Sequence, residues 1–597
     1  MFAKVILPLA VGKEFDYSFD AGSNVLAGMR VAVNFRGYRR VGIVIAVTDK
    51  SAVKNIKPIL EILDDEPIIS SEKFEFARQL ASIYPYSHAE FLFRMVPKYL
   101  KSFKKVKGRY TNDITSPGAL SCAGRYFYKS DRFSVRYAAW NDKIKTALLS
   151  GSVLICLPQE SFIDEVRSFV ETDFPGKVHV LHSALSDKEF FHQWANSRSN
   201  SIIIGLRSAI FYYQHDLRLI IVEDEPNRHY LQEEKPYYNL PDIAGALAQL
   251  KNIQYIMSGM YPSIKTYNDI KEKRVILKDL SNVGNPDNIR VLDTSIDNKS
   301  RIITAAFKEQ LAKTINNKKK AIILFNRTGY NKVIACSVCG EKLNCPRCSS
   351  GLSITSDLTE GVCPYCGYKQ PVPQVCPKCK EGSIKSYGLG INKVISILHK
   401  LFSDITVGEW RATAYNTDIC LATSKLFSDI YEDKFDGDGF YLDVDRELSR
   451  IDYDATFLTY IMIMKLAFFV SGTLNVFTTN DDHYLFKEIN NDWHDFYDYE
   501  LSLREKFKLP PYSGVAKVIV RSKEKNKLFK AADDLYNRLK KQNIDVYGPM
   551  QESPFMLRGN YRYSLVVKSY DGGIRDVIEF EMAYMRKLKV KVAAVIQ

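Results

Sequence analysis

Eight of the eleven cysteines in this chain lie within one short stretch and form four C-x-x-C pairs. A C-x-x-C turn places two thiolates on one metal ion, and two such turns complete the tetrahedral S4 site that structural zinc prefers. A single pair is equally typical of a redox-active dithiol, but four pairs together favour metal binding. The pairs are Cys336 and Cys339, Cys345 and Cys348, Cys363 and Cys366, and Cys376 and Cys379.

This spacing predicts a module that holds two Zn2+ ions with no ligand left over. Because sulfur fills both sites, no coordination position remains for a water molecule, and both ions are expected to be structural. The other three cysteines, Cys122, Cys156 and Cys420, lie in apolar segments and are expected to be reduced core residues. That usage of cysteine is typical of a reducing cytoplasm.

The composition is that of a large globular protein with a basic surface. The length of 597 residues favours roughly three to five domains. The formal net charge of +14 suits a polyanionic partner such as nucleic acid, although many basic proteins bind none. The first residues lack the features of a secretory signal.

One apolar stretch, Phe457–Leu474, is about as long as a membrane span. Lys465 lies at its centre, and Ser471 and Gly472 interrupt it, which disfavours a membrane helix. The stretch therefore predicts a buried helix followed by a strand, and no membrane association is expected.

Short apolar runs and turns alternate over the first hundred residues, which predicts a small β-rich domain followed by a helix over Ser71–Ile83. Continuous apolar runs then alternate with helical stretches, as in strands that are buried on both faces of a parallel sheet. These runs cover 152–157, 177–181, 201–206, 217–222 and 253–258. A further strand is predicted over Ser134–Ala139.

The same pattern resumes on both sides of the cysteines, at 321–325, 418–423 and 474–479, so the metal module is expected to be an insertion into a second lobe. The predicted fold class is multidomain α/β, with two parallel-sheet lobes, a β-rich N-terminal domain and an α+β C-terminal domain. The predicted domains are 1–100, a basic linker at 101–135, lobe 1 at 136–278, lobe 2 at 279–335 and 381–480, the metal module at 336–380 and the C-terminal domain at 481–597.

Motifs along nearly the entire chain resemble the primosomal protein N′ family, PriA, the replication restart DNA helicases of bacteria. The spacing of the four cysteine pairs is similar to that of the family, and so are the segments around them. These segments read L-S-D-K-E-F-F-H-Q-W (185–194), I-I-I-G-L-R-S-A-I-F (202–211), I-I-L-F-N-R-T-G-Y (322–330), G-L-G-I-N-K-V (388–394), L-P-P-Y (509–512) and G-N-Y-R-Y-S-L-V-V-K (559–568).

The resemblance implies two RecA-like lobes of superfamily 2 and a nested pairing of the cysteine turns. The family's winged-helix domain would fall on 101–135, which is short enough for that domain to be absent or rudimentary. The implied ligands of one zinc are Cys336, Cys339, Cys376 and Cys379, and those of the other are Cys345, Cys348, Cys363 and Cys366.

The resemblance also implies that the N-terminal domain binds the 3′ end of DNA at a fork. The family's pocket falls on Phe15, Asp16 and Lys57. Its glycine falls on Gly37 or is replaced by Arg36, because the chain reads N-F-R-G where the family has P-F-G.

The chain departs from the family in the motifs that handle ATP. A P-loop needs glycines, a lysine and a Ser or Thr to hold phosphates and Mg2+, and no G-x-x-x-x-G-K-[ST] occurs. Lys145 precedes a threonine but follows no glycine, and a lysine on an ordinary helix is the favoured interpretation. The second motif keeps the carboxylates Glu223, Asp224 and Glu225, but Pro226 replaces its histidine.

The arginines of the sixth motif, which stabilise charge on the γ-phosphate, are also missing. No arginine occurs from Ile451 to Leu503. Loss of an arginine finger lowers the rate by about 10³–10⁵. The vestigial catalytic set is therefore Lys145, Asp224 and Glu225, and the sequence favours a chain without ATP, Mg2+ or ATPase activity.

The leading hypothesis is a PriA-like replication restart protein that binds stalled or branched forks and promotes reloading of the replicative helicase without ATP-driven unwinding. An active, divergent ATP-dependent 3′–5′ helicase is one alternative, so whether the chain is an enzyme stays open. A degenerating copy without function is another. The expected partners are forked DNA with single-stranded regions, primosome proteins, single-stranded DNA-binding protein and a helicase loader, at the nucleoid in the cytoplasm.

Overall fold

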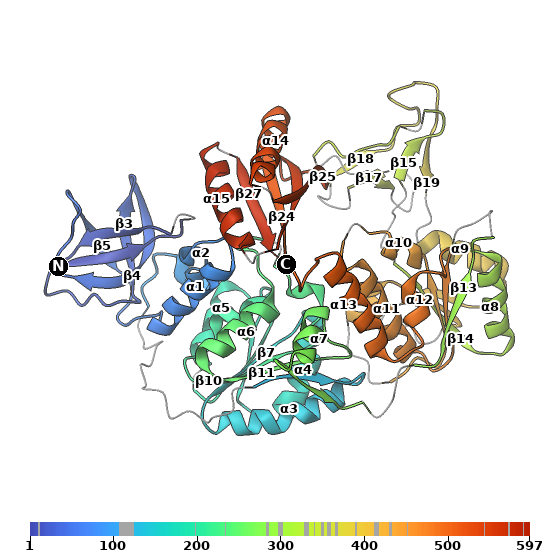
Figure 1. The fold of residues 1–597 in the computed structure, drawn as a ribbon, viewed down its shortest axis with the longest axis horizontal. Helices are drawn as coiled ribbons and strands as arrows, with labels where there is room; N and C mark the ends of the chain where they lie inside the picture. The colour runs from blue at the N-terminus through green and yellow to red at the C-terminus, as the bar shows by residue number, and fades with distance from the viewer. Residues whose placement is uncertain are drawn as a thin grey trace. The chain divides into compact units, whose positions relative to one another are not determined.

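The computed structural model of the chain describes all residues except 10–11, 107–123, 198, 233, 282–285, 297–301, 327–332, 340, 348–350, 355–359, 364–367, 388–390, 411–416, 429–432, 451, 543, 571–572, 589 and 597. The chain divides into two compact units. One unit holds Met1–Leu280 with Arg575–Glu579 and Ile596, and the other holds the rest of the chain from Ser281. Figure 1 shows the elements of both units.

The N-terminal domain is a closed barrel with the strand order β1-β2-β5-β3-β4 (Figure 1). Its strands are β1 (Phe2–Ile6), β2 (Glu14–Ser18), β3 (Arg30–Phe35), β4 (Tyr38–Thr48) and β5 (Lys57–Ile62). Because successive side chains of a strand point to opposite faces, alternate residues such as Val31 and Val33 fill the interior. The β-rich domain predicted from the sequence is confirmed.

Helical segments follow the barrel. They are α1 (Ser71–Ile83), α2 (His88–Leu92) and the 3-10 helix η1 (Lys98–Lys101). The predicted helix over Ser71–Ile83 is confirmed, and Ser70 caps it because its hydroxyl accepts a backbone N–H of the first turn. The fully buried Arg30 donates to Asp64 and to the carbonyl of Ser102, which ties the segment after η1 to the barrel.

Lobe 1 is a parallel sheet with the strand order β12-β6-β11-β10-β7-β9-β8. Its strands are β6 (Arg125–Lys129), β7 (Ser152–Cys156), β8 (Val178–Leu181), β9 (Ile202–Gly205), β10 (Leu217–Val222), β11 (Gln254–Gly259) and β12 (Ile276–Asp279). Its helices are α3 (Phe133–Leu148), α4 (Ser161–Asp173), α5 (Asp187–Asn196), α6 (Leu240–Lys251) and α7 (Ile264–Lys271), with 3-10 helices η2 (Arg207–Tyr212) and η3 (Arg228–Tyr230). The five continuous apolar runs are strands, as predicted.

The predicted strand over Ser134–Ala139 is wrong. These residues lie in α3, whose buried side chains, among them Tyr137, Trp140 and Ile144, recur at helical spacing. A short apolar run fits either a strand or a helix, and only a longer window separates them. The first strand, β6, also lies inside the segment 101–135, so the sheet of lobe 1 begins before the predicted bound.

Lobe 2 is a second parallel sheet, with the strand order β13-β23-β22-β14-β21-β20. Its strands are β13 (Ile289–Asp293), β14 (Lys320–Phe325), β20 (Val407–Glu409), β21 (Ile419–Ala422), β22 (Gly437–Leu442) and β23 (Leu474–Thr478). Its helices are α8 (Ala305–Asn316), α9 (Ile391–Leu401), α10 (Val444–Leu448) and α11 (Ala455–Phe469), with the 3-10 helix η4 (Ser424–Ser428).

The apolar stretch Phe457–Leu474 forms most of α11 and the start of β23, as predicted from its interruption by polar residues. Most side chains of α11 are buried on every side, which is typical of a helix inside a protein core. In the part of the chain that the structure describes, no helix combines the length and the hydrophobicity that a membrane crossing needs.

The metal module lies between β14 and α9. β15 (Val333–Cys336) pairs with β19 (Ile384–Tyr387), and β16 (Ser353–Ile354), β17 (Glu360–Val362) and β18 (Lys369–Pro371) form a small sheet. Because β14 and β21 are neighbours in one sheet, the module is an insertion into lobe 2, as predicted.

The C-terminal region is α+β, as predicted. Helices α12 (Tyr484–Glu488) and α13 (Trp493–Lys506) precede a sheet in the order β25-β26-β24-β27. Its elements are β24 (Gly514–Ser522), α14 (Lys525–Lys541), β25 (Asp545–Leu557), β26 (Asn560–Ser569), α15 (Ile574–Lys587) and β27 (Lys591–Ile596).

Candidate functional site

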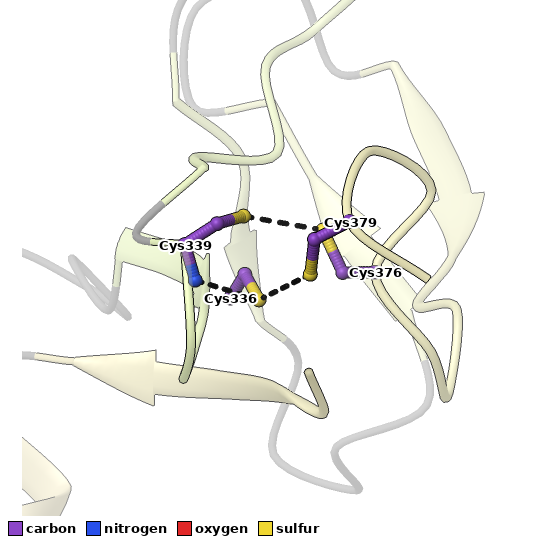
Figure 2. Close-up of side chains that lie close together, drawn as sticks. All are labelled: Cys336, Cys339, Cys376 and Cys379. Atoms are coloured by element: carbon purple, nitrogen blue, oxygen red, sulfur yellow. Dashed lines mark hydrogen bonds between the residues drawn. The ribbon is translucent and has the colours of Figure 1, made fainter. Parts of the chain in front are cut away.

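Four cysteine thiols from the two ends of the module meet at one point, as Figure 2 shows. β15 ends at Cys336 and pairs antiparallel with β19, which follows the turn that carries Cys376 and Cys379. The Sγ atoms of Cys336 and Cys379 lie 3.6 Å apart, and those of Cys339 and Cys376 lie 3.7 Å apart. All four Sγ atoms lie within 4.8 Å of one another.

These distances fit a tetrahedral zinc site. With a Zn–S bond of about 2.3 Å, the edge of a sulfur tetrahedron measures ~3.8 Å. The structure thus brings together the four thiols that the resemblance assigned to one ion. Four sulfur donors suit Zn2+ and leave no position for water, so the centre could hold a structural ion.

Backbone N–H groups point at the sulfur atoms and favour their charged form. The amides of Val338 and Cys339 each donate to Cys336 Sγ at 3.4 Å, and Gly382 donates to Cys379 Sγ at 3.4 Å. The Cys339 amide, with smaller contributions from the Val338 amide and the neighbouring thiols, lowers the pKa of Cys336 to about 6. The backbone N–H groups of Glu381 and Gly382 lower the pKa of Cys379.

Cys339 behaves differently. The backbone N–H of Glu341 lowers its pKa, but desolvation and hydrogen bonds with the other thiols raise it to about 11. In the metal-free centre Cys339 therefore retains a proton at neutral pH. Since a metal ion binds the thiolate, binding must displace that proton.

The second predicted centre falls only partly on residues that the structure describes. Cys345 and Cys363 are both buried in one apolar cluster with Ile334 and Leu352. The other two predicted ligands, Cys348 and Cys366, lie outside the described residues. The second zinc site therefore stays a prediction.

The acidic motif of lobe 1 lies at the carboxyl edge of the sheet, where open α/β sheets bind ligands. Glu223, which follows β10, has 0% of its surface exposed. Arg136, in the first turn of α3, donates its Nε to Glu223 Oε1 at 3.0 Å, and its Nη2 pairs with the same oxygen. Ser258 donates its hydroxyl to Glu223 Oε2 at 2.6 Å, so both carboxylate oxygens are occupied.

The two neighbouring carboxylates also have partners within the chain. Glu225 accepts hydrogen bonds from the Ser263 amide at 2.9 Å, the Ser263 hydroxyl at 2.8 Å and the Thr266 hydroxyl at 2.9 Å. Burial raises the pKa of Glu225, and these hydrogen bonds oppose the rise. Asp224 has a left-handed backbone, with a φ of 51°, and accepts a hydrogen bond from Asn227 at 2.8 Å.

The turn that leads into α3 leaves little room for a phosphate loop. A P-loop joins a strand to a helix through a long glycine-rich segment, but β6 ends at Lys129 and α3 begins at Phe133. The three intervening residues include no glycine. Arg136 Nη1 donates to the carbonyl of Ser130 at 2.5 Å, which ties this turn to the ion pair.

Lys145 lies far along α3 from that turn. It belongs to the last turn of the helix, its side chain is 60% exposed, and the nearest carboxylate is that of Asp142 at 3.9 Å. Within the described residues no contact joins it to Asp224 or Glu225. The interpretation as a lysine on an ordinary helix fits this placement.

The residues of the predicted DNA pocket lie on three parts of the barrel. Phe15, on β2, packs edge-on against Phe35, with ring centroids 4.9 Å apart. Asp16 accepts a hydrogen bond from Ser51 and lies 3.6 Å from Lys4 Nζ.

Lys57 begins β5, is exposed and stands opposite Tyr17 of β2, one residue from Asp16. Gly37 lies at the β3–β4 turn, where Arg36 and Gly37 have φ of 52° and 86°. The register therefore brings Asp16 and Lys57 onto adjacent strands, whereas Gly37 lies in the turn beyond Phe35.

Sequence reasoning missed two residues of these sites. Arg136 stood in an apolar run that was interpreted as a strand, where a buried charge was the available signal. Gly382 packs so tightly against the metal centre that a Cβ there would overlap Cys336 Sγ and lie 3.1 Å from the Cβ of Val338. Its signal was a glycine just after the last cysteine turn.

Comparison with known families finds two matches. Residues 4–97 match the model of the PriA 3′ DNA-binding domain, and residues 505–592 match the model of the primosomal protein N C-terminal domain. The first match covers the barrel with α1 and α2, and the second covers most of the C-terminal sheet.

Curated relatives are similar over most of the chain. Replication restart protein PriA of Borreliella burgdorferi is 24% identical over 89% of this chain and 89% of its own length. The Rickettsia conorii protein of that name is 22% identical over 95% of this chain and 94% of its own length. The Bacillus subtilis protein is 25% identical over 71% of this chain and 57% of its own length, so the match spans little more than half of that relative.

Solved structures give weaker likenesses. S. cerevisiae Dbp5 bound to RNA and ADP BeF3 has a TM-score of 0.33 at 11% identity, covering 69% of this chain and 97% of that one. RecG bound to a three-way DNA junction has a TM-score of 0.34 at 12% identity, and the match covers 73% of this chain and 47% of that one. Scores this low carry no argument about function.

Changing Gly382 to alanine is expected to weaken metal binding at the Cys336 centre by about 10–100-fold, the usual effect of disturbing the groups around metal ligands. The added Cβ would push Cys336 Sγ out of place. A chelator competition with the zinc-loaded chain measures the effect. Gly351→Ala is the matched control in the same module, because its Cβ would meet no atom within 4 Å. Equal affinities of the two variants would contradict the predicted role of Gly382.

The affinity of the centre for Zn2+ is expected to rise with pH across neutrality. Cys339 has a pKa of about 11 in the metal-free centre and must lose its proton, whereas Cys336, with a pKa of about 6, is already charged. Each displaced proton raises the affinity about tenfold per pH unit. The measurement compares zinc affinity between about pH 6.5 and 8.5 with that of a Cys336→Ser/Cys376→Ser variant, which lacks this centre. If the difference in zinc affinity between the chain and this variant does not change with pH, no proton is displaced from the centre and the prediction is wrong.

Proposed function

Because the chain belongs to the PriA family, we propose that it is a replication restart protein that binds stalled or branched DNA forks and promotes reloading of the replicative helicase without ATP-driven unwinding. The relatives named above are replication restart proteins, and the barrel matches a 3′ DNA-binding domain. The proposal includes two structural Zn2+ ions, with primosome proteins, single-stranded DNA-binding protein and a helicase loader as partners.

The surface of the barrel supports a role in binding DNA. Arg36 lies in the β3–β4 turn, and Arg39, which pairs with Glu61, and Arg40 follow Tyr38 at the start of β4. Tyr38 is 69% exposed. The Arg40 guanidinium lies 5.8 Å from the ring centroid of Tyr38. Cations that contact phosphates beside an exposed aromatic ring on which a base can stack are typical of single-stranded nucleic-acid binding.

The observation that carries the proposal of an inactive motor is the ion pair of Arg136 with Glu223. In an ATPase, carboxylates at this edge of the sheet hold the Mg2+ that comes with the nucleotide. Here Arg136, in the first turn of α3, pairs with Glu223, and its guanidinium supplies the positive charge beside that carboxylate. Removing one partner of a buried pair costs about 3–5 kcal/mol because the other charge is left unpaired, so a nucleotide would have to provide a new partner for Arg136 and for Glu223.

The alternative of an active, divergent helicase requires Lys145, Asp224 and Glu225 to act on one nucleotide. Their placement disfavours it, because Lys145 is exposed in the last turn of α3 while Glu225 already accepts three hydrogen bonds. The alternative of a degenerating copy predicts that fork DNA is not bound. One zinc-loaded preparation, assayed for nucleotide and for fork binding, separates the three hypotheses.

The full chain is expected neither to bind a fluorescent ATP analogue at up to about 1 mM, the upper end of usual KM values, nor to hydrolyse ATP when forked DNA is added. The physical reason is that Arg136 already pairs with Glu223, and the turn before α3 has no glycine-rich loop to hold phosphates. The Lys145→Ala variant is tested in the same nucleotide-binding and hydrolysis assays. Fork-stimulated hydrolysis that this substitution abolishes would overturn the proposal in favour of the active helicase.

Asp16 is expected to recognise the 3′-hydroxyl of DNA, since a carboxylate accepts a hydrogen bond from a hydroxyl and repels a phosphate. A fork with a 3′-hydroxyl should therefore bind more tightly than one with a 3′-phosphate. Asp16→Asn should reduce this preference by about tenfold or more, the worth of a hydrogen bond to a charged group.

Fluorescence anisotropy with the two forks measures the preference. Asp20→Asn is the matched control, because Asp20 is exposed and follows the same strand. A preference that survives Asp16→Asn would remove Asp16 from the pocket. Failure of the unchanged chain to bind either fork at moderate salt would favour the degenerating copy.

A further inference from the structure

Lobe 2 carries a cavity of about 370 Å³ that is lined by four lysines. Lys318 and Lys319 come from the turn between α8 and β14, Lys320 begins β14, and Lys434 comes from the segment before β22. β14 and β22 are parallel neighbours that begin at Lys320 and Gly437. The cavity therefore lies at the amino edge of the sheet of lobe 2, the edge opposite to that at which α/β folds bind nucleotides.

Two carboxylates near these lysines accept hydrogen bonds from neutral donors. Asp436, the one acid in the lining, accepts a hydrogen bond from the Ser471 hydroxyl at 3.1 Å. Asp438 lies behind the lining and accepts hydrogen bonds from the Thr314 hydroxyl at 2.8 Å and the Thr473 amide at 2.9 Å. Both carboxylates are thus used to join the segments that form the cavity wall.

The lysines consequently differ in how far they are neutralised. Lys319 Nζ lies 3.6 Å from Asp438 Oδ1, so part of its charge is balanced. Lys318 and Lys434 are exposed and form no ion pair with any residue that the structure describes. The lining, with four lysines and one aspartate, therefore carries an excess of positive charge.

The dipole of α8 does not account for this arrangement. Cations are favourable at the carboxyl end of a helix, and α8 ends at Asn316, just before Lys318. Lys434, however, comes from a different segment and lines the same cavity. Two separate segments thus place lysines in the lining of one cavity. Stabilisation of α8 would explain only the lysines that follow that helix.

We propose that this cavity is an anion site that binds phosphate groups, supplied either by a nucleic-acid backbone or by a free polyphosphate. Lysine is a common phosphate ligand because its ammonium group is a compact point charge. Phe435 is the one aromatic residue of the lining, but it is 3% exposed and offers no surface for a base to stack. Recognition would therefore involve phosphate alone and would not depend on base sequence.

The site extends the proposed DNA binding to lobe 2, and its test separates the two proposals. The experiment uses the zinc-loaded full chain with Lys318→Ala/Lys434→Ala. The matched control is Lys308→Ala/Lys400→Ala, which removes the same charge from exposed positions of lobe 2 outside the cavity lining. The four substituted lysines are exposed, so both variants should unfold at the same temperature as the unchanged chain. That measurement verifies that the variants are folded.

Two readouts distinguish the sources of phosphate. The first is the slope of log K for single-stranded DNA against log salt, which should become shallower by about 1.4 for two lost contacts. The second is the affinity for tripolyphosphate, measured by calorimetry, which should fall about tenfold for two lost charges. A change of slope identifies the nucleic-acid backbone, and a change in tripolyphosphate affinity alone identifies a free anion.

If neither readout differs between the cavity variant and the control variant, the anion site is refuted. If the unchanged chain binds tripolyphosphate through these lysines but binds no DNA, the proposed function fails while the anion site stands.

Discussion

A buried carboxylate must be neutralised, and lobe 1 is built around the way in which Glu223 meets this requirement. Its position at the carboxyl end of a central parallel strand excludes water, and an unpaired charge there would be very costly. In a nucleotide-driven motor, a metal ion bound to phosphate balances such a charge. Here the balance comes from Arg136, a residue of the same lobe. The turn after β6, the start of α3 and the end of β11 are all fixed by contacts with this pair.

The polar groups around Glu223 form hydrogen bonds with one another and with the backbone of lobe 1. Tyr230 donates its hydroxyl to the carbonyl of Cys156 at 2.9 Å, beside the strand end that carries Glu223. Glu225 joins the strand end to the first turn of α7 through Ser263 and Thr266. Glu223 and Glu225 thus already make contacts within the lobe. Freeing them for a nucleotide would take several coupled changes, because residues that share partners do not act independently.

Features that depend on neighbouring residues could be predicted from the sequence, and features that depend on distant ones could not. The runs that became β7 and β9–β11 are mostly apolar, and the cysteine pairs specify metal ligands by their own spacing. Arg136 is different, since its role depends on the helical state of Ser134–Ala139 and on a contact with a residue 87 positions away. Gly382 similarly matters only because antiparallel pairing brings it against Cys336.

The identity of the cation at Glu223 separates a motor from a scaffold. A motor must exchange its cation in every cycle, because Mg2+ enters with the nucleotide and leaves with the product. A guanidinium attached to α3 is part of the chain and cannot leave with a product. The pair is therefore a permanent part of the lobe, unlike a metal ion that is exchanged in each cycle. The cysteine centre needs no such exchange, since sulfur ligands hold a structural ion permanently. A fixed charge at Glu223 and a permanent ion at the cysteines would thus let the lobe and the module keep their folds without the exchange of a ligand.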